Sequence, residues 1–178
     1  MNERMELPGG LVLRPWETTD APAVRGAFAE PGMERQADAP VGSVSDAERW
    51  VRRRQDQWSR GTAFAFAVVD ASDTALGGVA VSSLDTRHAT GWVSYWTGSG
   101  ARGRGVATLG CRALADWCFT ELDVFRLELG HRTDNPASCR VALASGFAAE
   151  GLQRRKLLYD GVRYDVETHA RLVTDPAP

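Results

Sequence analysis

The sequence predicts an α/β domain with a mixed (α+β) sheet and elements in the order β α α β β β α β α β β. Three observations favour this fold class. Residues 62–69 alternate between bulky apolar side chains and alanine, as the two faces of a strand do. A glycine-rich turn at residues 98–105 leads from a strand-like segment into a helix with apolar side chains at helical spacing. Asp160 and Gly161 separate two long strand-like segments, which is typical of a hairpin. Hairpins combined with one strand–helix–strand unit indicate a mixed sheet covered by helices.

The N-terminal elements are a strand and a helix. Residues 10–14 contain the apolar run Leu-Val-Leu and predict the first strand, which Pro15 ends. Residues 18–20 have the composition of a helix start, and Pro22 falls in the first turn, where its missing N–H is not needed. Residues 30–32, Glu-Pro-Gly, end this helix.

A loop and a second helix follow. Residues 33–44 show little periodicity and contain glycine and proline, so they predict a loop. Ser45 and Glu48 have the spacing of a capping box, in which each side chain bonds the backbone N–H of the other. We therefore expect the second helix to start there, to run to about Ser59 and to end at Gly61.

The middle of the chain predicts three strands, a helix and a further strand. The alternating residues 62–69 and the segment 75–84 form a hairpin, because a turn rich in Asp and Ser joins them. Residues 90–97 form the third strand of this group. The glycine-rich turn then opens a helix over residues 106–121, and residues 124–129 form the strand that follows.

The C-terminal elements are a short helix and a hairpin. Asn135 is a good N-cap residue, Pro136 takes the first helical position, and Gly146 ends the helix. Residues 147–159 and 162–172 form the two final strands.

The bulk composition is that of a soluble globular protein. The chain has 178 residues, of which 43% are hydrophobic and 25% charged, with a net charge of −2. This balance indicates neither nucleic acid nor an anionic membrane as a partner. No apolar run has the length of a membrane span, and the charged start of the chain lacks the apolar core of a signal peptide. Three cysteines, an odd number, argue against a disulfide framework. We expect a cytoplasmic protein with one domain over residues 1–173 and a disordered tail at 174–178.

The glycine-rich turn is the clearest candidate for ligand binding. Such a turn leaves backbone N–H groups unpaired at the positive end of a helix dipole, which makes an anion site and most often a phosphate site. Arg102 and Arg104 add two positive charges at its rim. A nucleoside-triphosphate P-loop is excluded because Val106, not lysine, follows Gly105, and the strand order is wrong for a dinucleotide fingerprint. A purely structural turn and an acyl-coenzyme A pyrophosphate site remain open.

Two motifs and their context resemble the Gcn5-related N-acetyltransferase (GNAT) superfamily. Residues 102–107, Arg-Gly-Arg-Gly-Val-Ala, match that family's phosphate motif, Gln/Arg-x-x-Gly-x-Gly/Ala. Residues 135–138, Asn-Pro-Ala-Ser, followed by Gly-Phe at 146–147, resemble its Asn-x-x-Ala/Ser segment. The strand end at residues 95–96, together with residues 160–165, resembles the RimJ/RimL type, which acetylates protein N-termini.

The resemblance implies a fold, a cofactor and a reaction. It implies a GNAT-like single domain with a splayed central strand pair, acetyl-CoA as cofactor, and acetyl transfer to a primary amine by direct attack in a ternary complex. The acceptor would be a peptide or protein N-terminus or a small-molecule amine, and the basic segment 154–156 is a candidate homodimer surface. The implied cofactor-binding residues are Trp96, Thr97, Arg102, Gly103, Arg104, Gly105, Val106, Ala107, Thr108, Asn135, Ser138 and Arg140.

The resemblance also assigns catalytic roles around the second motif. Many family members carry a tyrosine seven residues after the motif asparagine, as the acid that protonates the leaving thiolate, but this chain has Ala142 there. The RimJ/RimL type commonly has a serine three residues after the asparagine, so Ser138 is the expected acid. The alternative for Ser138 is a small residue required where the helix meets the cofactor. Asn135 is expected to orient the pantetheine arm or the thioester, to cap the helix, or both. Backbone N–H groups near residues 96–98 would stabilise the oxyanion.

A general base is required because an alkylammonium ion is not a nucleophile. Glu128 is one candidate, since a carboxylate inside a strand is costly unless it faces a wet cleft or a partner; the alternative is a structural pair with Arg126. His131 is the other, because imidazole exchanges protons near neutral pH; the alternative is an exposed loop histidine. Glu30 and Glu34, in the loop that the family uses around the acceptor, are candidate amine ligands or ordinary solvated carboxylates.

Two other functions remain open. An antibiotic-modifying acetyltransferase would act on an aminoglycoside-like amine, but the acceptor loop carries few acidic residues for a polycation, namely Glu34 and Asp38. A non-catalytic acyl-CoA-binding or sensing domain would keep the phosphate turn without the chemistry, which the absence of a tyrosine at Ala142 favours. The three histidines are scattered and no Cys/His spacing fits zinc, so no metal site is expected.

Overall fold

An eight-stranded mixed sheet forms the middle layer of the computed structural model, which describes residues 4–33, 37 and 39–178. The strand order is β1-β2-β3-β4-β5-β6-β8-β7, and the β5–β6 pair is parallel whereas the other neighbouring pairs are antiparallel. The strands are β1 (Met5–Leu7), β2 (Leu11–Pro15), β3 (Phe64–Val69), β4 (Ala75–Asp85), β5 (Thr90–Thr97), β6 (Arg126–Arg132), β7 (Ala148–Tyr159) and β8 (Val162–Leu172).

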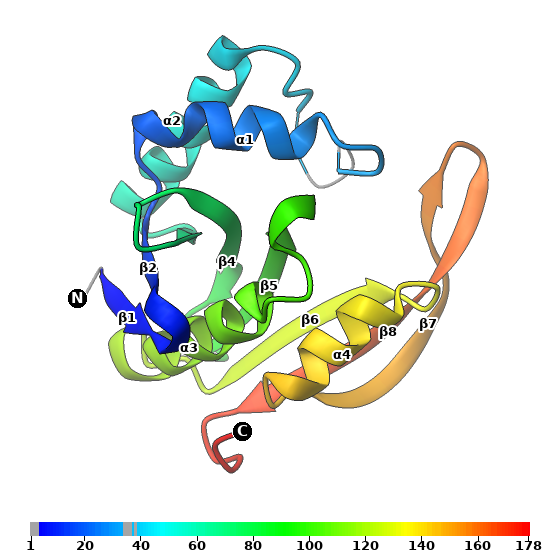
Figure 1. Ribbon diagram of the computed structural model, residues 1–178. Coiled ribbons are helices and arrows are strands. Elements are labelled where there is room, and N and C mark those ends of the chain that lie inside the picture. Colours follow the sequence, from blue (N-terminus) through cyan, green and yellow to red (C-terminus); the bar gives the residue numbers. More distant parts are fainter. Residues whose placement is uncertain (1–3, 34–36, 38) are drawn as a thin grey trace.

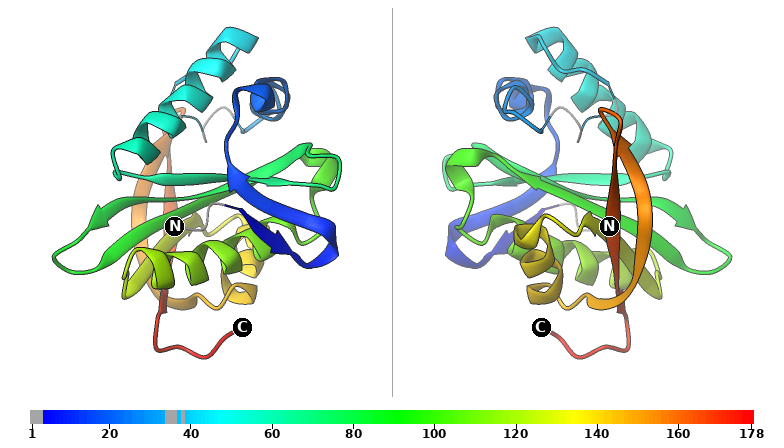
Figure 2. Two further views of the ribbon diagram at one scale, coloured as in Figure 1. Left: turned by 90° about the vertical axis from the view of Figure 1, so that its left-hand side faces the viewer. Right: turned by 90° about the vertical axis from the view of Figure 1, so that its right-hand side faces the viewer.

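Four helices cover the two faces of the sheet. They are α1 (Ala21–Phe28), α2 (Val44–Ser59), α3 (Val106–Glu121) and α4 (Pro136–Ala144). Figures 1 and 2 show α1 and α2 on one face and α3 and α4 on the other. The predicted fold class and element order are confirmed, apart from the additional short strand β1. In the part of the chain that the structure describes, no helix combines the length and the apolar character needed to cross a bilayer.

Strand β3 shows why both faces are packed. Its residues are buried without exception, and alternate side chains enter two different apolar clusters. Phe64 and Phe66 pack against Trp117 of α3 on one face, with ring centroids 5.2 and 5.1 Å apart. The alanines of β3 lie on the other face, below α1 and α2, where small side chains leave room for the indoles of Trp16 and Trp50. The alternation in the sequence therefore predicted the strand correctly.

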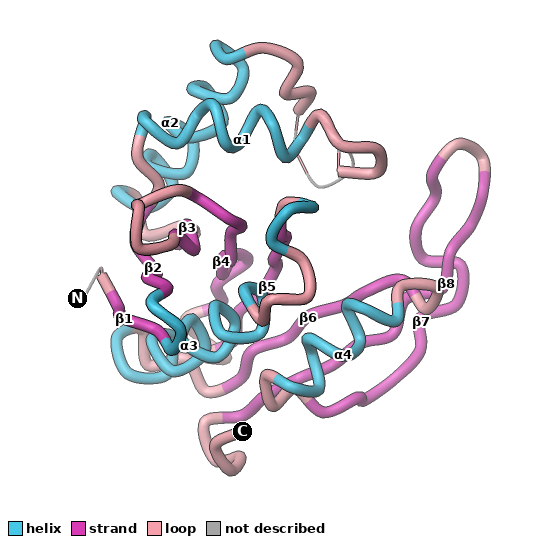
Figure 3. The backbone as a smooth tube through the Cα atoms, viewed as in Figure 1, coloured by secondary structure: helices cyan, strands magenta, loops and turns pink. Residues whose placement is uncertain are grey.

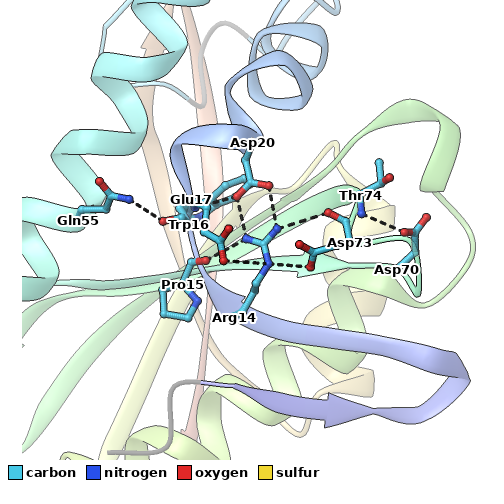
Figure 4. Close-up of polar contacts among 9 residues, drawn as sticks. All are labelled: Arg14, Pro15, Trp16, Glu17, Asp20, Gln55, Asp70, Asp73 and Thr74. Atoms are coloured by element: carbon cyan, nitrogen blue, oxygen red, sulfur yellow. Dashed lines mark hydrogen bonds and ion pairs between the residues drawn. The ribbon is translucent and has the colours of Figure 1, made fainter.

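A buried ion pair holds the N-terminal half of the molecule together (Figure 4). Arg14 is 3% exposed and binds both carboxylate oxygens of Asp20, at 2.8 and 3.0 Å. Its Nε also donates to Asp73 at 2.9 Å, in the turn between β3 and β4. Nearby, Gln55 of α2 donates to the Trp16 carbonyl oxygen at 2.9 Å. These contacts join β2, the start of α1, the β3–β4 turn and α2.

Helix α2 begins earlier than predicted. Its N-cap is Ser43, which accepts a hydrogen bond from Asp46 N at 3.1 Å, while the Asp46 carboxylate accepts from Ser43 N at 2.8 Å. The prediction of a capping box at Ser45 and Glu48 is therefore wrong. Aspartate closes such a box as glutamate does, and a negative charge in the first turn also complements the helix dipole.

Candidate active site

Strands β5 and β6 diverge at the centre of the sheet. Residues 90–92 of β5 pair with residues 126–128 of β6, and the register ends there. Beyond this point β5 follows β4 as far as Thr97, whereas β6 follows β8 as far as Arg132. We call the resulting opening between the two strands the wedge; its two arms are visible in Figure 1. The splayed central strand pair is thus confirmed.

Two backbone N–H groups of β5 point toward the wedge. The N–H of Gly98 donates to the Leu76 carbonyl at 3.0 Å, on the side of β4. Successive N–H groups of an extended strand point to opposite neighbours, so those of Thr97 and Tyr95 point to the open side. Donors placed in this way can stabilise an oxyanion.

The glycine-rich turn between β5 and α3 has an open backbone. Figure 3 shows a short helical turn after β5, at Ser99–Ala101, before the chain enters α3. Gly103 and Gly105 have φ values of +74° and +78°, a backbone conformation that residues other than glycine adopt only with strain. A Cβ atom at Gly103 would meet nothing within 4 Å. A ligand can therefore approach the backbone of this turn closely.

The first turn of α3 offers unpaired N–H groups beside that turn. Gly105 is the N-cap, and no side chain caps the helix. The first hydrogen bond within the helix runs from Leu109 N to Gly105 O at 2.9 Å. The N–H groups of Val106, Ala107 and Thr108 come before it, so the helix offers them no carbonyl acceptor. These groups and the helix dipole have the arrangement that the predicted anion site requires.

Arg102 is held by the segment that follows α1. Its Nη2 lies 2.9 Å from Glu30 Oε2, and its Nε donates to the Thr97 carbonyl at 3.2 Å. The other Glu30 oxygen accepts from Ser99 N at 2.9 Å. The hydrogen bonds from Ser99, followed by the charge of Arg102, hold the pKa of Glu30 below its ordinary value. Glu30 therefore links α1 to the phosphate-type turn and is already engaged by a cation.

The two other predicted arginines are exposed. Arg104 lies on the turn itself, and Arg140 lies on α4. The acceptor-loop residues Glu34 and Asp38 are outside the described residues. The basic segment 154–156 is exposed on β7.

Asn135 and Ser138 are brought together at the start of α4. Asn135 is the N-cap, and its Oδ1 accepts from Ser138 N at 3.1 Å, as the capping alternative predicted. Ser138 Oγ lies 2.8 Å from the phenol oxygen of Tyr95, which also donates to the Ser138 carbonyl at 3.0 Å. Burial raises the pKa of Tyr95, so the phenol keeps its proton at neutral pH.

Tyr95 is the residue that sequence reasoning missed. Its hydrogen bonds cross from β5 to α4, whereas its neighbours Ser94 and Trp96 face the opposite side of the sheet. The strand alternation carried this signal, because it places residue 95 on the face that α3 and α4 cover. The approach of α4 to that face depends on the tertiary fold and has no local signature.

Glu128 forms the ion pair that was its predicted alternative. Its Oε1 accepts from Arg126 Nε at 2.6 Å, and Arg126 also binds Glu150, with Nη1 at 3.0 Å from the carboxylate. The Glu128 side chain is 41% exposed. It lies opposite Trp92 in the last register pair before the strands diverge, so it sits at the vertex of the wedge.

His131 lies inside β6 and not in an exposed loop. Strand β6 runs to Arg132, three residues further than predicted, because its pairing with β8 continues. The His131 side chain is 5% exposed, and its Nε2 is 3.0 Å from Nε2 of His169. The alternative of an exposed loop histidine is therefore wrong. His131 lies three positions after Glu128 in the same strand, so the two base candidates face opposite sides of the sheet.

A pocket of about 230 Å³ lies beside the wedge, on the face that α1 and α2 cover. Three indoles line it, those of Trp16, Trp50 and Trp96, and Trp16 stacks on Trp96 with centroids 5.7 Å apart. The buried Nε1 of Trp50 has no hydrogen-bond partner among the described residues. Polar side chains of Arg54, Gln57, Ser82 and Ser94 complete the lining.

Comparison with known families shows to which family the chain belongs. A family model described as "Acetyltransferase (GNAT) domain" matches residues 10–148, which include the wedge strands, the glycine-rich turn and α4. The chain belongs to the GNAT acetyltransferase family. The predicted N-acetyltransferase activity is confirmed by this membership.

Curated relatives of this GNAT acetyltransferase cover most of its length. It is 28% identical over 174 residues to "Probable N-acetyltransferase YjcK" of Bacillus subtilis (strain 168), covering 93% of this chain and 95% of the relative. It is 26% identical over 133 residues to "Ribosomal-protein-serine acetyltransferase" of Escherichia coli (strain K12), covering 75% and 74% of the two chains.

A solved structure shows the same fold. RimL, a ribosomal L7/L12 alpha-N-protein acetyltransferase crystallised in complex with coenzyme A, aligns with this GNAT acetyltransferase at a TM-score of 0.84. The sequence identity is 20%, and the alignment covers 96% of this chain and 98% of RimL. The predicted GNAT fold is confirmed.

Proposed function

We propose that this enzyme binds acetyl-CoA along the wedge and acetylates the α-amino group of a peptide or protein. The observation that carries the proposal is the alignment of three features at one opening of the sheet. They are the unpaired N–H groups of α3, the N–H groups of β5 on the open side, and the Ser138 hydroxyl that Tyr95 holds.

The residues at the glycine-rich turn fit a cofactor pyrophosphate. The N–H groups of residues 106–108 would bind it, and the positive φ of Gly103 and Gly105 keeps side chains away from it. Arg104 and Arg140 are exposed and would add positive charge, whereas Arg102 would act through its contacts with Glu30 and Thr97. RimL, which shares this fold, is described in complex with coenzyme A, which supports coenzyme A as the ligand. Acetyl-CoA would supply an acetyl group activated as a thioester.

The chain's own groups would then act on the reacting atoms. The N–H of Thr97, beside Trp96, would stabilise negative charge on the acetyl oxygen. As the carbon–nitrogen bond forms and the carbon–sulfur bond breaks, the Ser138 hydroxyl would donate its proton to sulfur. The single phenol O–H of Tyr95 stays protonated and donates to the Ser138 carbonyl; as Ser138 loses its proton, this O–H would turn to donate to Ser138 Oγ instead. Asn135 would hold the start of α4, and so Ser138, in place.

Glu128 is the base that the geometry favours over His131. It faces the α1/α2 side of the sheet, which also carries the Trp-lined pocket and Trp92. Arg126 binds one carboxylate oxygen, so the other remains for the acceptor ammonium. The acceptor ammonium loses two protons when it becomes an amide. Glu128 would take the first and pass it to solvent, which leaves a neutral amine to attack the thioester. The second balances the proton that sulfur receives from Ser138, and solvent would return a proton to Ser138, so that the net reaction releases one proton.

The acceptor class follows from charge and from the relatives. Glu30 is neutralised by Arg102, so the described part of the acceptor side offers little negative charge for an aminoglycoside-like polycation. A peptide N-terminus carries a single charge, and the Trp-lined pocket has room for its first side chain. Two relatives described above are ribosomal-protein acetyltransferases, which supports a protein acceptor.

The first experiment is calorimetric titration of the purified chain with acetyl-CoA, with free adenosine bisphosphate as the comparison ligand. Micromolar binding that requires the pantetheine arm is expected. Peptides with a free α-amine, or with a blocked α-amine and a free lysine, then distinguish the acceptors by mass spectrometry. Acetylation of the first peptide alone supports the proposal. Binding without turnover on any amine would favour the non-catalytic sensor instead, and absence of binding would contradict both.

A further inference from the structure

Four side chains with metal-binding atoms meet beneath α4. They are His131 of β6, Cys139 of α4, and Glu167 and His169 of β8, and their donor atoms lie within 4.8 Å of one another. His131 lies opposite Glu167 in the β6–β8 register, and His169 lies two residues further along the same strand, so the three side chains share one face. Helix α4 supplies Cys139 from above that face.

The donor atoms are close and face one another. The two Nε2 atoms, of His131 and His169, are 3.0 Å apart. Glu167 Oε1 lies 2.8 Å from Nε2 of His169 and 3.6 Å from Nε2 of His131. Cys139 Sγ lies 3.5 Å from the same Glu167 oxygen. A tetrahedral Zn²⁺ with bonds of about 2.0–2.3 Å separates its ligand atoms by about 3.3–3.7 Å, so small side-chain adjustments reach that geometry.

Backbone hydrogen bonds fix which ring nitrogens face the cluster. Nδ1 of His131 lies 2.9 Å from the Arg132 carbonyl, and Nδ1 of His169 lies 3.2 Å from the Phe147 carbonyl. A carbonyl oxygen only accepts, so each Nδ1 carries its proton and each neutral ring directs an Nε2 lone pair at the cluster. With both rings neutral, two imidazole lone pairs and a carboxylate oxygen face one another, an arrangement that favours a cation between them.

We propose that these four residues form a binding site for a divalent transition-metal ion, with Zn²⁺ the ion that the donor set fits best. Two imidazoles, a thiolate and a carboxylate are the ligands that Zn²⁺ accepts, whereas Ca²⁺ and Mg²⁺ require oxygen donors. The Nδ1–H bonds to backbone carbonyls are the contacts that orient histidine ligands in metal sites. A metal ion satisfies all four groups at once. The metal-free alternative is a proton held between the two rings, with the Cys139 thiol donating to Glu167, and the experiment below distinguishes the two.

A metal ion at this site would hold α4 against the sheet. The two histidine side chains are 5% and 0% exposed, whereas Glu167 is 35% exposed, so the cluster opens to solvent on the Glu167 side. A bound ion would connect α4 to β6 and β8 through Cys139. Ser138 is adjacent to Cys139, so the ion would also fix the helix that carries the Ser138 hydroxyl on one arm of the wedge. This inference stands on the cluster geometry and does not depend on the proposed acceptor.

No local pattern in the sequence predicts this cluster, because its members are separated by 7, 27 and 1 intervening residues and come from three elements. No compact Cys/His motif contains them. The β6–β8 register and the placement of α4 bring them together.

The test uses the full chain, treated with a chelator and then titrated with Co²⁺ and Zn²⁺. We expect one equivalent of Co²⁺ per chain, with tetrahedral d–d absorption and a sulfur-to-cobalt charge-transfer band. We also expect a melting temperature that rises with Zn²⁺ concentration, since the ion binds the folded state. Cys139→Ser should abolish the charge-transfer band, and Cys139→Ser and Glu167→Gln should each weaken Zn²⁺ binding at least about tenfold.

His88→Ala is the matched control, because His88 is exposed and lies outside the cluster. It should leave stoichiometry and affinity unchanged. Cys139 and Glu167 are only partly buried, so their variants should keep the native circular dichroism even where variants of the buried histidines do not fold. Failure to take up cobalt, or Zn²⁺ binding unaltered by both Cys139→Ser and Glu167→Gln, would overturn the proposal. Nitrogen NMR showing a proton held between the two Nε2 atoms at saturating Zn²⁺ would overturn it as well.

Discussion

The Tyr95 phenol and the Ser138 hydroxyl are 2.8 Å apart although they belong to β5, one strand of the wedge, and to α4, the helix that follows the other strand, β6. The same phenol donates to the Ser138 carbonyl at 3.0 Å, so Tyr95 positions both the backbone and the side chain of Ser138. A proton donor at the end of a wedge needs such support, because a free serine hydroxyl rotates and would also bond to water. In the proposed mechanism, Tyr95 would support the acid Ser138 from a strand, whereas position 142 carries alanine and not tyrosine.

Ser138→Ala should lower kcat about 10- to 100-fold, toward the small end of general-acid effects because water can share the role. Tyr95→Phe should lower kcat about tenfold and reduce stability by about 1 kcal/mol, the usual value of one hydrogen bond. Neither variant should change the dissociation constant of acetyl-CoA more than about twofold, since both hydroxyls act at the sulfur and not at the phosphates. Steady-state kinetics and calorimetry on the same preparations provide the measurements.

Two substitutions far from the wedge are the controls for this prediction. Ser59→Ala lies at the end of α2, and Tyr164→Phe lies on the late hairpin, where Arg132 stacks on its ring. Both should retain full kcat. A Tyr95→Phe enzyme with unchanged kcat would show that the contact is only structural.

Gly105→Val should weaken acetyl-CoA binding at least about tenfold, because a side chain at the N-cap of α3 disturbs the N–H groups that would bind the pyrophosphate. The substitution should also cost about 1–2 kcal/mol of stability, since φ is +78° there. Calorimetric titration measures the first effect, and urea unfolding measures the second.

Gly161→Val separates strain from binding. Gly161 also has a φ of +78°, but it lies in the hairpin turn between β7 and β8. It should show a similar loss of stability and unchanged affinity for acetyl-CoA. Equal affinity losses in both variants would mean that the Gly105 effect reports a damaged fold and not a phosphate site.

Local patterns predicted most of the elements, and long-range contacts determined what they missed. The alternation of residues 62–69, the N-cap at Asn135 and the turn at Asp160 and Gly161 are decided within a few residues, so the sequence predicted them correctly. The start of α2 was wrong because two overlapping tetrapeptides satisfy the same capping rule. Strand β1 was missed because three residues carry too little periodicity to indicate a strand.

The candidate site divides in the same way. The phosphate-type turn and the start of α4 are contiguous motifs, and their local geometry could be predicted. The contacts of Tyr95 with Ser138 and of Glu30 with Arg102 join residues 43 and 72 positions apart, and no local pattern specifies them. The same holds for His131, whose surroundings come from β8 and α4.

Arg14→Met should reduce stability by about 3–5 kcal/mol, because it leaves the carboxylate of Asp20 buried without its cation. Asp20→Leu added to Arg14→Met should recover part of that loss, since a buried pair can be replaced by apolar side chains at lower cost than by breaking it. Arg25→Ala, on the exposed side of α1, should stay within about 0.5 kcal/mol of the parent. Urea unfolding followed by circular dichroism gives these values, and equal effects of Arg14→Met and Arg25→Ala would contradict the buried-pair interpretation.

Glu30 should make the junction between α1 and the glycine-rich turn sensitive to acid. Its pKa in the folded protein is held below the ordinary value of 4.5, first by the hydrogen bonds from Ser99 and then by Arg102. A lowered carboxylate pKa adds stability above the unfolded value, and that stability is lost as the pH falls through the folded pKa. We therefore compare the free energies of unfolding of the parent and of Glu30→Gln. The parent should be more stable by a constant amount of less than about 1 kcal/mol near neutral pH, and this difference should shrink below about pH 4.5.

The contribution of Arg102 to this effect can be separated from that of Ser99. Added salt screens the exposed Arg102–Glu30 pair but leaves the hydrogen bond from Ser99 N in place. At 0.5 M salt the screening length is on the order of 4–5 Å. The stability difference between the parent and Glu30→Gln should therefore become smaller without disappearing. Urea unfolding of the parent and Glu30→Gln between pH 3 and 7 measures the difference directly. A difference that grows as the pH falls has the wrong sign for a lowered pKa and would exclude Glu30 as the link between α1 and the turn.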